Sequence, residues 1–129
     1  MAEDERLRVL VIDDEESVRL SLELHFQDCG FETLSVESAE EAIDRIDGFR
    51  PHAAVVDLRL PGMSGMDFIR CTAEEWPDMK YVIYTGSPAA QIPEDILSIP
   101  VVSEKLFFKP LEDLSKLSRQ LQKITGRSF

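Results

Sequence analysis

The chain has 129 residues, of which 43% are hydrophobic, and it carries a formal net charge of −11. A chain of this length is near the commonest size of a single domain and buries roughly two-thirds of its unfolded surface when it folds. The excess of acids argues against a direct nucleic-acid partner and against an anionic membrane, because binding to either requires Lys and Arg. It favours a cation or a basic partner.

The cysteines and the N-terminus indicate where the protein acts. Its two cysteines, Cys29 and Cys71, lack CxxC spacing, which favours a reducing compartment over a disulfide framework. The first eight residues, MAEDERLR, are polar and acidic, unlike a signal peptide. No apolar run approaches the roughly 20 residues that cross a membrane. These features predict a cytoplasmic protein without a membrane partner.

The first half of the chain alternates apolar runs with amphipathic segments. Strands are expected at residues 7–12 (LRVLVI), 31–36 and 52–57 (HAAVVD), and a helix at residues 15–29. Ser38, with Glu41 three residues later, predicts a capping box at the start of a second helix. The continuous apolar character of 52–57 is typical of a strand that is covered on both faces.

The second half continues this alternation but contains one irregular segment. We expect a helix at residues 64–75, strands at 81–84 and 105–108, and a last helix at 111–124. Three prolines, Pro88, Pro93 and Pro100, interrupt the segment 87–103, so any helix there is short, over about 94–99. The pattern predicts a doubly wound α/β fold, with parallel strands, right-handed crossovers and helices on both faces of the sheet.

The residues that end the strands share one edge of this sheet, where open parallel sheets bind ligands. They are Asp13, Asp14, Asp57, Thr85 and Lys109. Three neighbouring carboxylates repel one another unless a cation neutralises them, and Mg²⁺ is suited to such oxygen ligands. With an ammonium, a hydroxyl and a metal around it, a carboxylate can accept a phosphoryl group as an aspartyl phosphate.

Each of these residues also has a purely structural interpretation. Asp14 could cap the first helix, and Asp57 could begin a turn before Pro61. Thr85 alone is an ordinary residue at a strand end, and Lys109 alone is an ordinary surface lysine. Their convergence on one edge favours the functional interpretation. The two histidines, His25 and His52, have no partner at metal-ligand spacing and are interpreted as structural.

Four motifs in order resemble the receiver domain of response regulators in two-component signalling. They are the acidic pair in VLVIDDEES, the stretch VVDLRLPGMSG, YTG and FKP. The family pattern Asp-x-x-Leu/Met-Pro-x-x-x-Gly is matched by Asp57, Leu60, Pro61 and Gly65. The resemblance covers about residues 7–124, and we expect residues 1–129 to form a single receiver domain with that core.

The resemblance implies a flavodoxin-like sheet of five parallel strands in the order 2-1-3-4-5, flanked by five helices of which the fourth is short or irregular. It implies that Asp57 accepts a phosphoryl group from the phosphohistidine of a sensor histidine kinase or phosphotransfer protein. Asp13, Asp14, Asp57 and the backbone carbonyl of Arg59 would hold Mg²⁺. Lys109 would pair with the phosphoryl oxygens and Thr85 would move toward them.

Such a domain is a signalling module rather than an enzyme with a separate substrate, although it catalyses its own phosphorylation and dephosphorylation. Its output passes to a downstream protein or to an output domain that this sequence lacks, and a homodimer is a further expectation. The sequence leaves open whether the chain is a stand-alone receiver or part of a longer regulator or hybrid kinase.

The sequence departs from the family in two places. Leu106 stands where the family usually has an aromatic residue that turns inward as the Thr moves, and strand alternation points Phe107 away from Leu106. PVVSEK replaces the usual turn of small residues before the fifth strand, beside a rebuilt fourth helix. In the family, the face formed by the fourth and fifth helices and the fifth strand commonly carries output. Our hypothesis is intact phosphorylation chemistry with unusual output.

The positions two residues after Asp57 and Thr85 are Arg59 and Ser87. In the family such positions tune the lifetime of the phosphoryl group. Arg59 could shield the acyl phosphate or contact the kinase, or it could be a solvated loop residue.

Three other functions remain as alternatives. One is a receiver-like scaffold that binds proteins without being phosphorylated. An aspartate-nucleophile phosphatase would need an acid two residues after Asp57, where Arg59 stands. A flavodoxin-like cofactor carrier would need a Ser/Thr/Gly-rich phosphate loop after the first strand, where DDEES would repel a phosphate.

Overall fold

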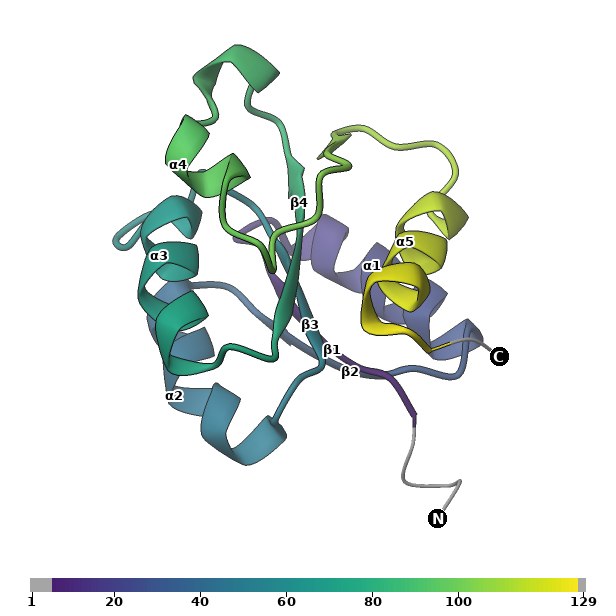
Figure 1. Cartoon of the computed structure of the whole chain (residues 1–129). Coiled ribbons are helices and arrows are strands. Elements are labelled where there is room, and N and C mark those ends of the chain that lie inside the picture. The colour runs from purple at the N-terminus through teal and green to yellow at the C-terminus, as the bar shows by residue number, and fades with distance from the viewer. Residues whose placement is uncertain (1–5, 128–129) are drawn as a thin grey trace.

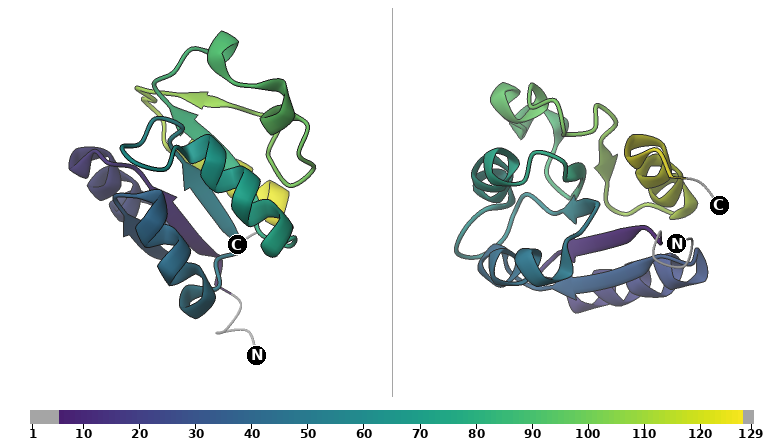
Figure 2. Two further views of the ribbon diagram at one scale, coloured as in Figure 1. Left: turned by 90° about the vertical axis from the view of Figure 1, so that its left-hand side faces the viewer. Right: turned by 60° about the horizontal axis from the view of Figure 1, so that its bottom comes forward.

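The computed structural model describes residues 6–127 of the chain. Within that range a parallel sheet lies between two layers of helices, with α2, α3 and α4 over one face and α1 and α5 over the other (Figures 1 and 2). The strands are β1 (Arg8–Ile12), β2 (Glu32–Val36), β3 (Ala53–Val56), β4 (Lys80–Thr85) and β5 (Phe107–Phe108). The helices are α1 (Glu16–Asp28), α2 (Ala39–Phe49), α3 (Gly65–Glu75), the 3₁₀ turn η2 (Ala89–Gln91), α4 (Glu94–Leu97) and α5 (Ser115–Thr125).

The strand order is β2-β1-β3-β4-β5 and every pairing is parallel, which confirms the predicted sheet. The strands stay in register at their carboxyl ends, where Ile12 pairs with Val56 and Val56 with Ile83. Backbone hydrogen bonds continue past the strands, from Asp57 N to Ile12 O at 3.1 Å and from Lys109 N to Thr85 O at 2.9 Å. This register brings the residues that follow the strands to one edge.

Alternating side chains of the central strands fill two cores. In β1, Leu10 and Ile12 face the layer of α2, α3 and α4, whereas Val9 and Val11 face α1 and α5. All four are fully buried, which explains why the strand is apolar without a break. At about 25 cal/mol per Å² of apolar surface, this two-sided burial is the main force that holds the sheet.

The fourth helix and the fifth strand are shorter than expected. α4 ends at Leu97, two residues before the predicted end, and β5 covers only half of the predicted 105–108. An isolated bridge pairs Val102 with Tyr81, so the chain meets β4 twice, first at its start and then at its end. Between these pairings the chain leaves the sheet, which accounts for the irregular segment.

Local contacts modify two other predictions. Ser38 Oγ accepts a hydrogen bond from Glu41 N at 3.1 Å, but the Glu41 carboxylate accepts from Glu37 N at 3.5 Å, so only half of the capping box forms. The N-cap of α1 is Glu15, and Asp14 has no capping role.

The histidines are structural, as predicted: His25 Nε2 lies 3.0 Å from Ser118 Oγ, and His52 Nδ1 accepts from Arg8 N at 2.9 Å.

No helix within residues 6–127 combines the length and the apolar character needed to cross a membrane.

A buried phenol predicts how stability depends on alkaline pH. Tyr81 is fully buried, its hydroxyl lies 2.7 Å from Thr72 Oγ1, and burial raises its pKa from 10.0 to about 12. The fold therefore favours the neutral phenol, and stability falls as pH rises from 10.0 toward 12. Tyr81→Phe should remove this component, on the order of 2 kcal/mol at the top of the range. Urea unfolding of both proteins across this range measures it, and parallel losses of stability would contradict it.

Candidate functional site

Asp57 lies at the centre of the strand-end cluster. It follows β3 directly, is only 5% exposed, and uses both carboxylate oxygens. Oδ1 accepts hydrogen bonds from Thr85 Oγ1 at 2.9 Å and from Arg59 N at 3.2 Å, and Oδ2 accepts from Lys109 Nζ at 2.9 Å. These three donors hold the buried carboxylate in one orientation.

The Lys109 ammonium neutralises the cluster. Nζ lies 2.7 Å from Asp13 Oδ2, 2.9 Å from Asp57 Oδ2 and 3.5 Å from Glu15 Oε2. Burial on its own would lower the pKa of Lys109, but the hydrogen bonds to Asp13 and Asp57 outweigh it and hold the pKa above the ordinary value. Lys109 is therefore charged at neutral pH and compensates two buried acids at once.

Asp13 and Asp14 differ in exposure, as neighbours at a strand end do. Asp13 is 2% exposed, and its Oδ1 accepts from Glu15 N at 2.9 Å. Burial raises the pKa of Asp13, and the Lys109 hydrogen bond opposes this only in part. Asp14 is exposed to solvent.

The three acids form a set of oxygen ligands. Asp13, Asp14 and Asp57 each offer a carboxylate oxygen, and these atoms lie within 4.8 Å of one another. Hard oxygen ligands from a few carboxylates, with room for water on the exposed Asp14 side, fit Mg²⁺.

The loop after Asp57 closes tightly on the site. Gly65 N donates to Leu58 O at 3.0 Å, and a Cβ at Gly65 would lie 2.1 Å from the Asp57 carbonyl oxygen. Only glycine permits this close approach, which accounts for a glycine eight residues after Asp57. Glu40 holds the far side of the loop, since its Oε2 accepts from Met63 N at 2.9 Å and this bond lowers the pKa of Glu40.

Arg59 makes hydrogen bonds to both Asp57 and Gln91. Its backbone N–H binds Asp57, and its guanidinium Nη2 donates to Gln91 Oε1 of η2 at 2.9 Å. The side chain therefore connects the loop after β3 with the segment after β4.

Known proteins resemble this chain over nearly its whole length. The family model described as "Response regulator receiver domain" matches residues 9–121. The chain belongs to the response-regulator receiver family. This receiver domain is 32% identical over 127 residues to the sensory/regulatory protein RpfC of Xanthomonas campestris pv. campestris, a match that covers 89% of the chain and 17% of RpfC. It is 41% identical over 80 residues to the two-component response regulator PhoP of Pseudomonas aeruginosa, covering 62% of the chain and 36% of PhoP.

The chain thus spans about a sixth of RpfC and about a third of PhoP. Among solved structures, a response regulator receiver protein from Pseudomonas putida superposes with a TM-score of 0.81 at 28% identity, covering 92% of this chain and 97% of that one. TrrA from Thermotoga maritima, solved in complex with Mg(2+)-BeF, superposes with a TM-score of 0.78 at 22% identity, covering 92% and 98%, and shares the fold.

The expected switch residues Thr85 and Leu106 lie at a buried and a half-buried position. Thr85 is fully buried, and its Oγ1 accepts from the backbone N of the buried Ser87 at 3.2 Å. Leu106 is half-buried against the core under α2, α3 and α4, whereas Phe107 packs in the core under α1 and α5. The alternation is as predicted, and Phe108 is 38% exposed. Phe107, the aromatic residue that follows Leu106, therefore lies in the core on the other face of the sheet.

Sequence reasoning missed three residues that contact this site or its loops. Glu15 approaches Lys109, Glu40 binds the loop after Asp57, and Gln91 binds Arg59. The run of acids in DDEE was a signal for Glu15. Glu40 and Gln91 carried no signal, because their contacts arise from the packing of α2 and from the conformation of η2.

Thr85→Val tests the hydroxyl that joins Asp57 to the segment after β4. Valine keeps the volume but leaves Asp57 Oδ1 without one donor and Ser87 N without its acceptor. We expect a loss of about 1–2 kcal/mol in the free energy of unfolding, measured with urea. Thr85→Ser keeps the hydroxyl and should lose less. Equal losses in the two variants would assign the effect to the methyl group instead.

Proposed function

We propose that this receiver domain accepts a phosphoryl group on the carboxylate of Asp57 from the phosphohistidine of a sensor histidine kinase or phosphotransfer protein. A carboxylate oxygen of Asp57 forms the new P–O bond, the P–N bond breaks, and the histidine leaves with its electron pair. The observation that carries this proposal is one buried carboxylate bonded at once to Lys109 Nζ and Thr85 Oγ1, beside two further acids.

In this proposal Asp13, Asp14, Asp57 and the backbone carbonyl of Arg59 hold Mg²⁺. When bound, the ion neutralises charge on the phosphoryl oxygens and on the acids. The carboxylates of Asp13 and Asp14 supply its ligands and keep it beside Asp57. The Arg59 carbonyl is assigned by the family resemblance.

Lys109 and Thr85 carry the response. Without a phosphoryl group, the Lys109 ammonium neutralises Asp13 and Asp57, and Thr85 donates to Asp57. Once Asp57 is an acyl phosphate, its carboxyl group no longer carries a charge, and the negative charge lies on the phosphoryl oxygens. These oxygens are then stronger acceptors than the remaining acyl oxygen, because charge-assisted hydrogen bonds are stronger than neutral ones. Lys109 then pairs with those oxygens and Thr85 moves toward them. Ser87 follows, since its N–H binds Thr85 Oγ1.

The output of this movement differs from that of receivers with an inward-turning aromatic. Leu106 occupies that position and is already packed in the core under α2, α3 and α4. The signal passes to a downstream protein or an output domain in cis, and dimerisation is one form that output can take. In this proposal the module catalyses its own phosphorylation and dephosphorylation, and residues 1–129 form a single domain. We place it in the cytoplasm, in keeping with its two free thiols.

Amide NMR spectra recorded with Mg²⁺ and beryllofluoride, a phosphoryl mimic, test this proposal. Mg²⁺ alone should shift the amides around Asp13, Asp57 and Arg59. Adding beryllofluoride should shift Thr85, Ser87 and Lys109 as well. In Asp13→Asn the Mg²⁺ shifts should require about tenfold more metal, because one charged ligand is lost. Mg²⁺ and beryllofluoride shifts that avoid these residues would overturn the assignment and favour an unphosphorylated scaffold.

A further inference from the structure

The loop between β3 and α3 is fixed at its two ends by its own backbone. At its start, Arg59 N donates to Asp57 Oδ1 at 3.2 Å. At its end, Gly65 N donates to Leu58 O at 3.0 Å. Between these two anchors lies a span of four residues, 60–63 (LPGM), whose conformation the end contacts do not determine.

A side chain from another element holds this span. Glu40, in the first turn of α2, accepts a hydrogen bond from Met63 N through Oε2 at 2.9 Å. Within residues 6–127 it is the one hydrogen bond that the span makes. The approach is close, because Gly62 has a φ of 75° and a Cβ there would lie 2.7 Å from Glu40 Oε2. Glycine provides both the left-handed conformation and the room for the carboxylate.

The carboxylate of Glu40 is suited to act as a fixed acceptor. It lies at the N-terminus of α2, where the free backbone N–H groups favour a negative charge. The hydrogen bond from Met63 N, and to a lesser degree that from its own backbone N–H, holds the pKa of Glu40 below its ordinary value. The acceptor is therefore an anion at neutral pH, and charge-assisted hydrogen bonds are stronger than neutral ones.

The span controls the orientation of the Arg59 carbonyl. That carbonyl belongs to the peptide group that joins Arg59 to Leu60, so a rotation of the span turns it. Leu60 and Met63 pack against the core under α2, α3 and α4, which limits the movement of their side chains. The turn at Gly62 lies between them and has no side chain to hold it, so the Glu40 carboxylate supplies the missing restraint.

We propose that Glu40 is a positioning residue of the phosphoryl site: its hydrogen bond to Met63 N fixes the turn at Gly62 and thereby holds the Arg59 carbonyl toward a metal ion beside Asp57. This inference rests on the proposed function, because it concerns the same metal ion. Glu40 acts through the backbone and does not touch the ion. Its removal should therefore weaken the affinity for Mg²⁺ without changing the reactivity of Asp57.

Three substitutions separate the hydrogen bond of Glu40 from its charge, since any nearby acid attracts a cation through space. Glu40→Ala removes both. Glu40→Gln removes the charge but keeps an acceptor for Met63 N. Glu41→Gln removes the same charge at the next position of α2, which is also exposed and whose carboxylate meets Glu37 N at 3.5 Å instead of the loop.

Amide NMR titration with Mg²⁺ measures the affinity of each protein. Glu40→Ala should bind Mg²⁺ about threefold to tenfold more weakly, which is less than the effect of a side chain that contacts a metal ligand directly. Glu40→Gln and Glu41→Gln should each weaken it less than about twofold, the part that is due to charge. At saturating Mg²⁺, the rate of phosphorylation by a small acyl-phosphate donor should be the same in all of these proteins.

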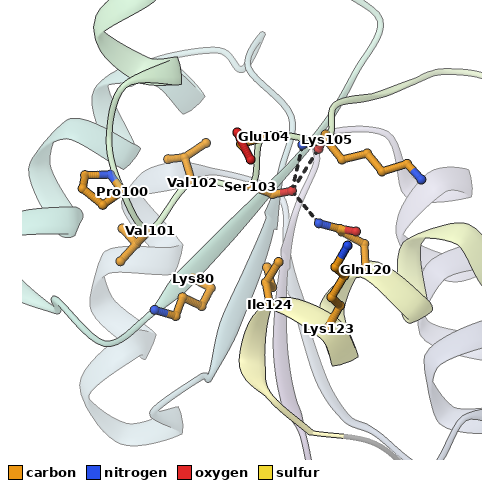
Figure 3. A pocket seen from close by; sticks show the side chains of 10 residues that line it. All are labelled: Lys80, Pro100, Val101, Val102, Ser103, Glu104, Lys105, Gln120, Lys123 and Ile124. Atoms are coloured by element: carbon orange, nitrogen blue, oxygen red, sulfur yellow. Dashed lines mark hydrogen bonds between the residues drawn. The ribbon is translucent and has the colours of Figure 1, made fainter.

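A hydrogen bond of the same length, far from the loop, provides the structural control. Gln120 of α5 donates through Nε2 to Ser103 Oγ at 2.9 Å and so ties a helix to the segment before β5 (Figure 3). α5 covers the face of the sheet opposite α2. Gln120→Ala should lower the urea midpoint, as Glu40→Ala does, but should leave the affinity for Mg²⁺ unchanged.

Amide hydrogen exchange without metal gives a measurement that does not depend on the proposed function. Glu40→Ala should speed the exchange of Met63 N–H and also that of Arg59 N–H, which binds Asp57 at the start of the loop. Gln120→Ala should speed neither. Faster exchange at Met63 alone would overturn the proposal, because the change would then not reach the site.

Two results of the Mg²⁺ titration would also overturn it. Glu40→Ala could leave the affinity unchanged, or Glu40→Gln could lower it as far as Glu40→Ala, which would assign the effect to charge. A parent protein that binds no Mg²⁺ near Asp57 would refute the proposed function instead, and the exchange of Arg59 N–H would still decide whether Glu40 positions the loop.

Discussion

Lys109→Met should lower the free energy of unfolding at neutral pH by about 2–4 kcal/mol when divalent cations are chelated. Methionine keeps most of the stem but leaves Asp13 and Asp57, 2% and 5% exposed, without their shared cation. Urea unfolding measures the loss. Lys109→Arg keeps the charge and should lose less. Lys116→Met, at an exposed lysine on α5, should change stability by less than about 0.5 kcal/mol.

The deficit of Lys109→Met should shrink under two conditions. Added Mg²⁺ should stabilise the variant more than the parent protein, because the ion takes over the neutralisation of the acids. Lower pH should act in the same direction. The pKa of Asp13 is already raised by burial, and its stabilising contribution is present at low pH and lost as pH rises through the folded-state value, so a proton can replace the missing ammonium. A deficit unaffected by metal and pH would show that Lys109 stabilises the fold by packing alone.

Gly65→Ala should be the most damaging small substitution in the loop after Asp57. The added Cβ would lie 2.1 Å from Asp57 O and 2.8 Å from Leu58 Cα, and both are backbone atoms that cannot rotate away. Either the loop opens, which displaces Asp57, or α3 shifts. We expect a loss of about 3 kcal/mol or more in the free energy of unfolding, together with loss of Mg²⁺ binding.

Gly48→Ala provides the matched control. Gly48 lies inside α2 and has nothing within 4 Å of an added Cβ, so alanine should stabilise the helix by about 0.5–1 kcal/mol. The two substitutions are chemically identical, and their opposite signs isolate the close approach to Asp57. Equal effects would mean that the approach of Gly65 to Asp57 is not required.

The layout of the site was predictable because it follows from topology. Parallel strands that end in register bring Asp13, Asp57 and the carboxyl ends of β4 and β5 to one edge, whatever the helices contain. Apolar runs marked the first four strands, and the four motifs marked the strand ends. The order of the strands came from the family resemblance rather than from periodicity.

The parts that sequence reasoning placed poorly depend on side-chain contacts between distant elements. Residues 100–106 show neither helical nor strand periodicity, because Val102 pairs with Tyr81 of β4 and the chain then crosses to β5. The Arg59–Gln91 and Glu40–Met63 hydrogen bonds join residues 32 and 23 positions apart.

Intact-mass measurement after incubation with Mg²⁺ and a small acyl-phosphate donor tests the central claim most directly, with Asp57→Asn as the matched control. The account predicts a gain of one phosphoryl group in the parent protein, with no gain in Asp57→Asn and none when Mg²⁺ is chelated. A parent protein that gains no phosphoryl group under any of these conditions, or an Asp57→Asn variant that gains one equally, would contradict the assignment of Asp57 as the phosphoryl acceptor.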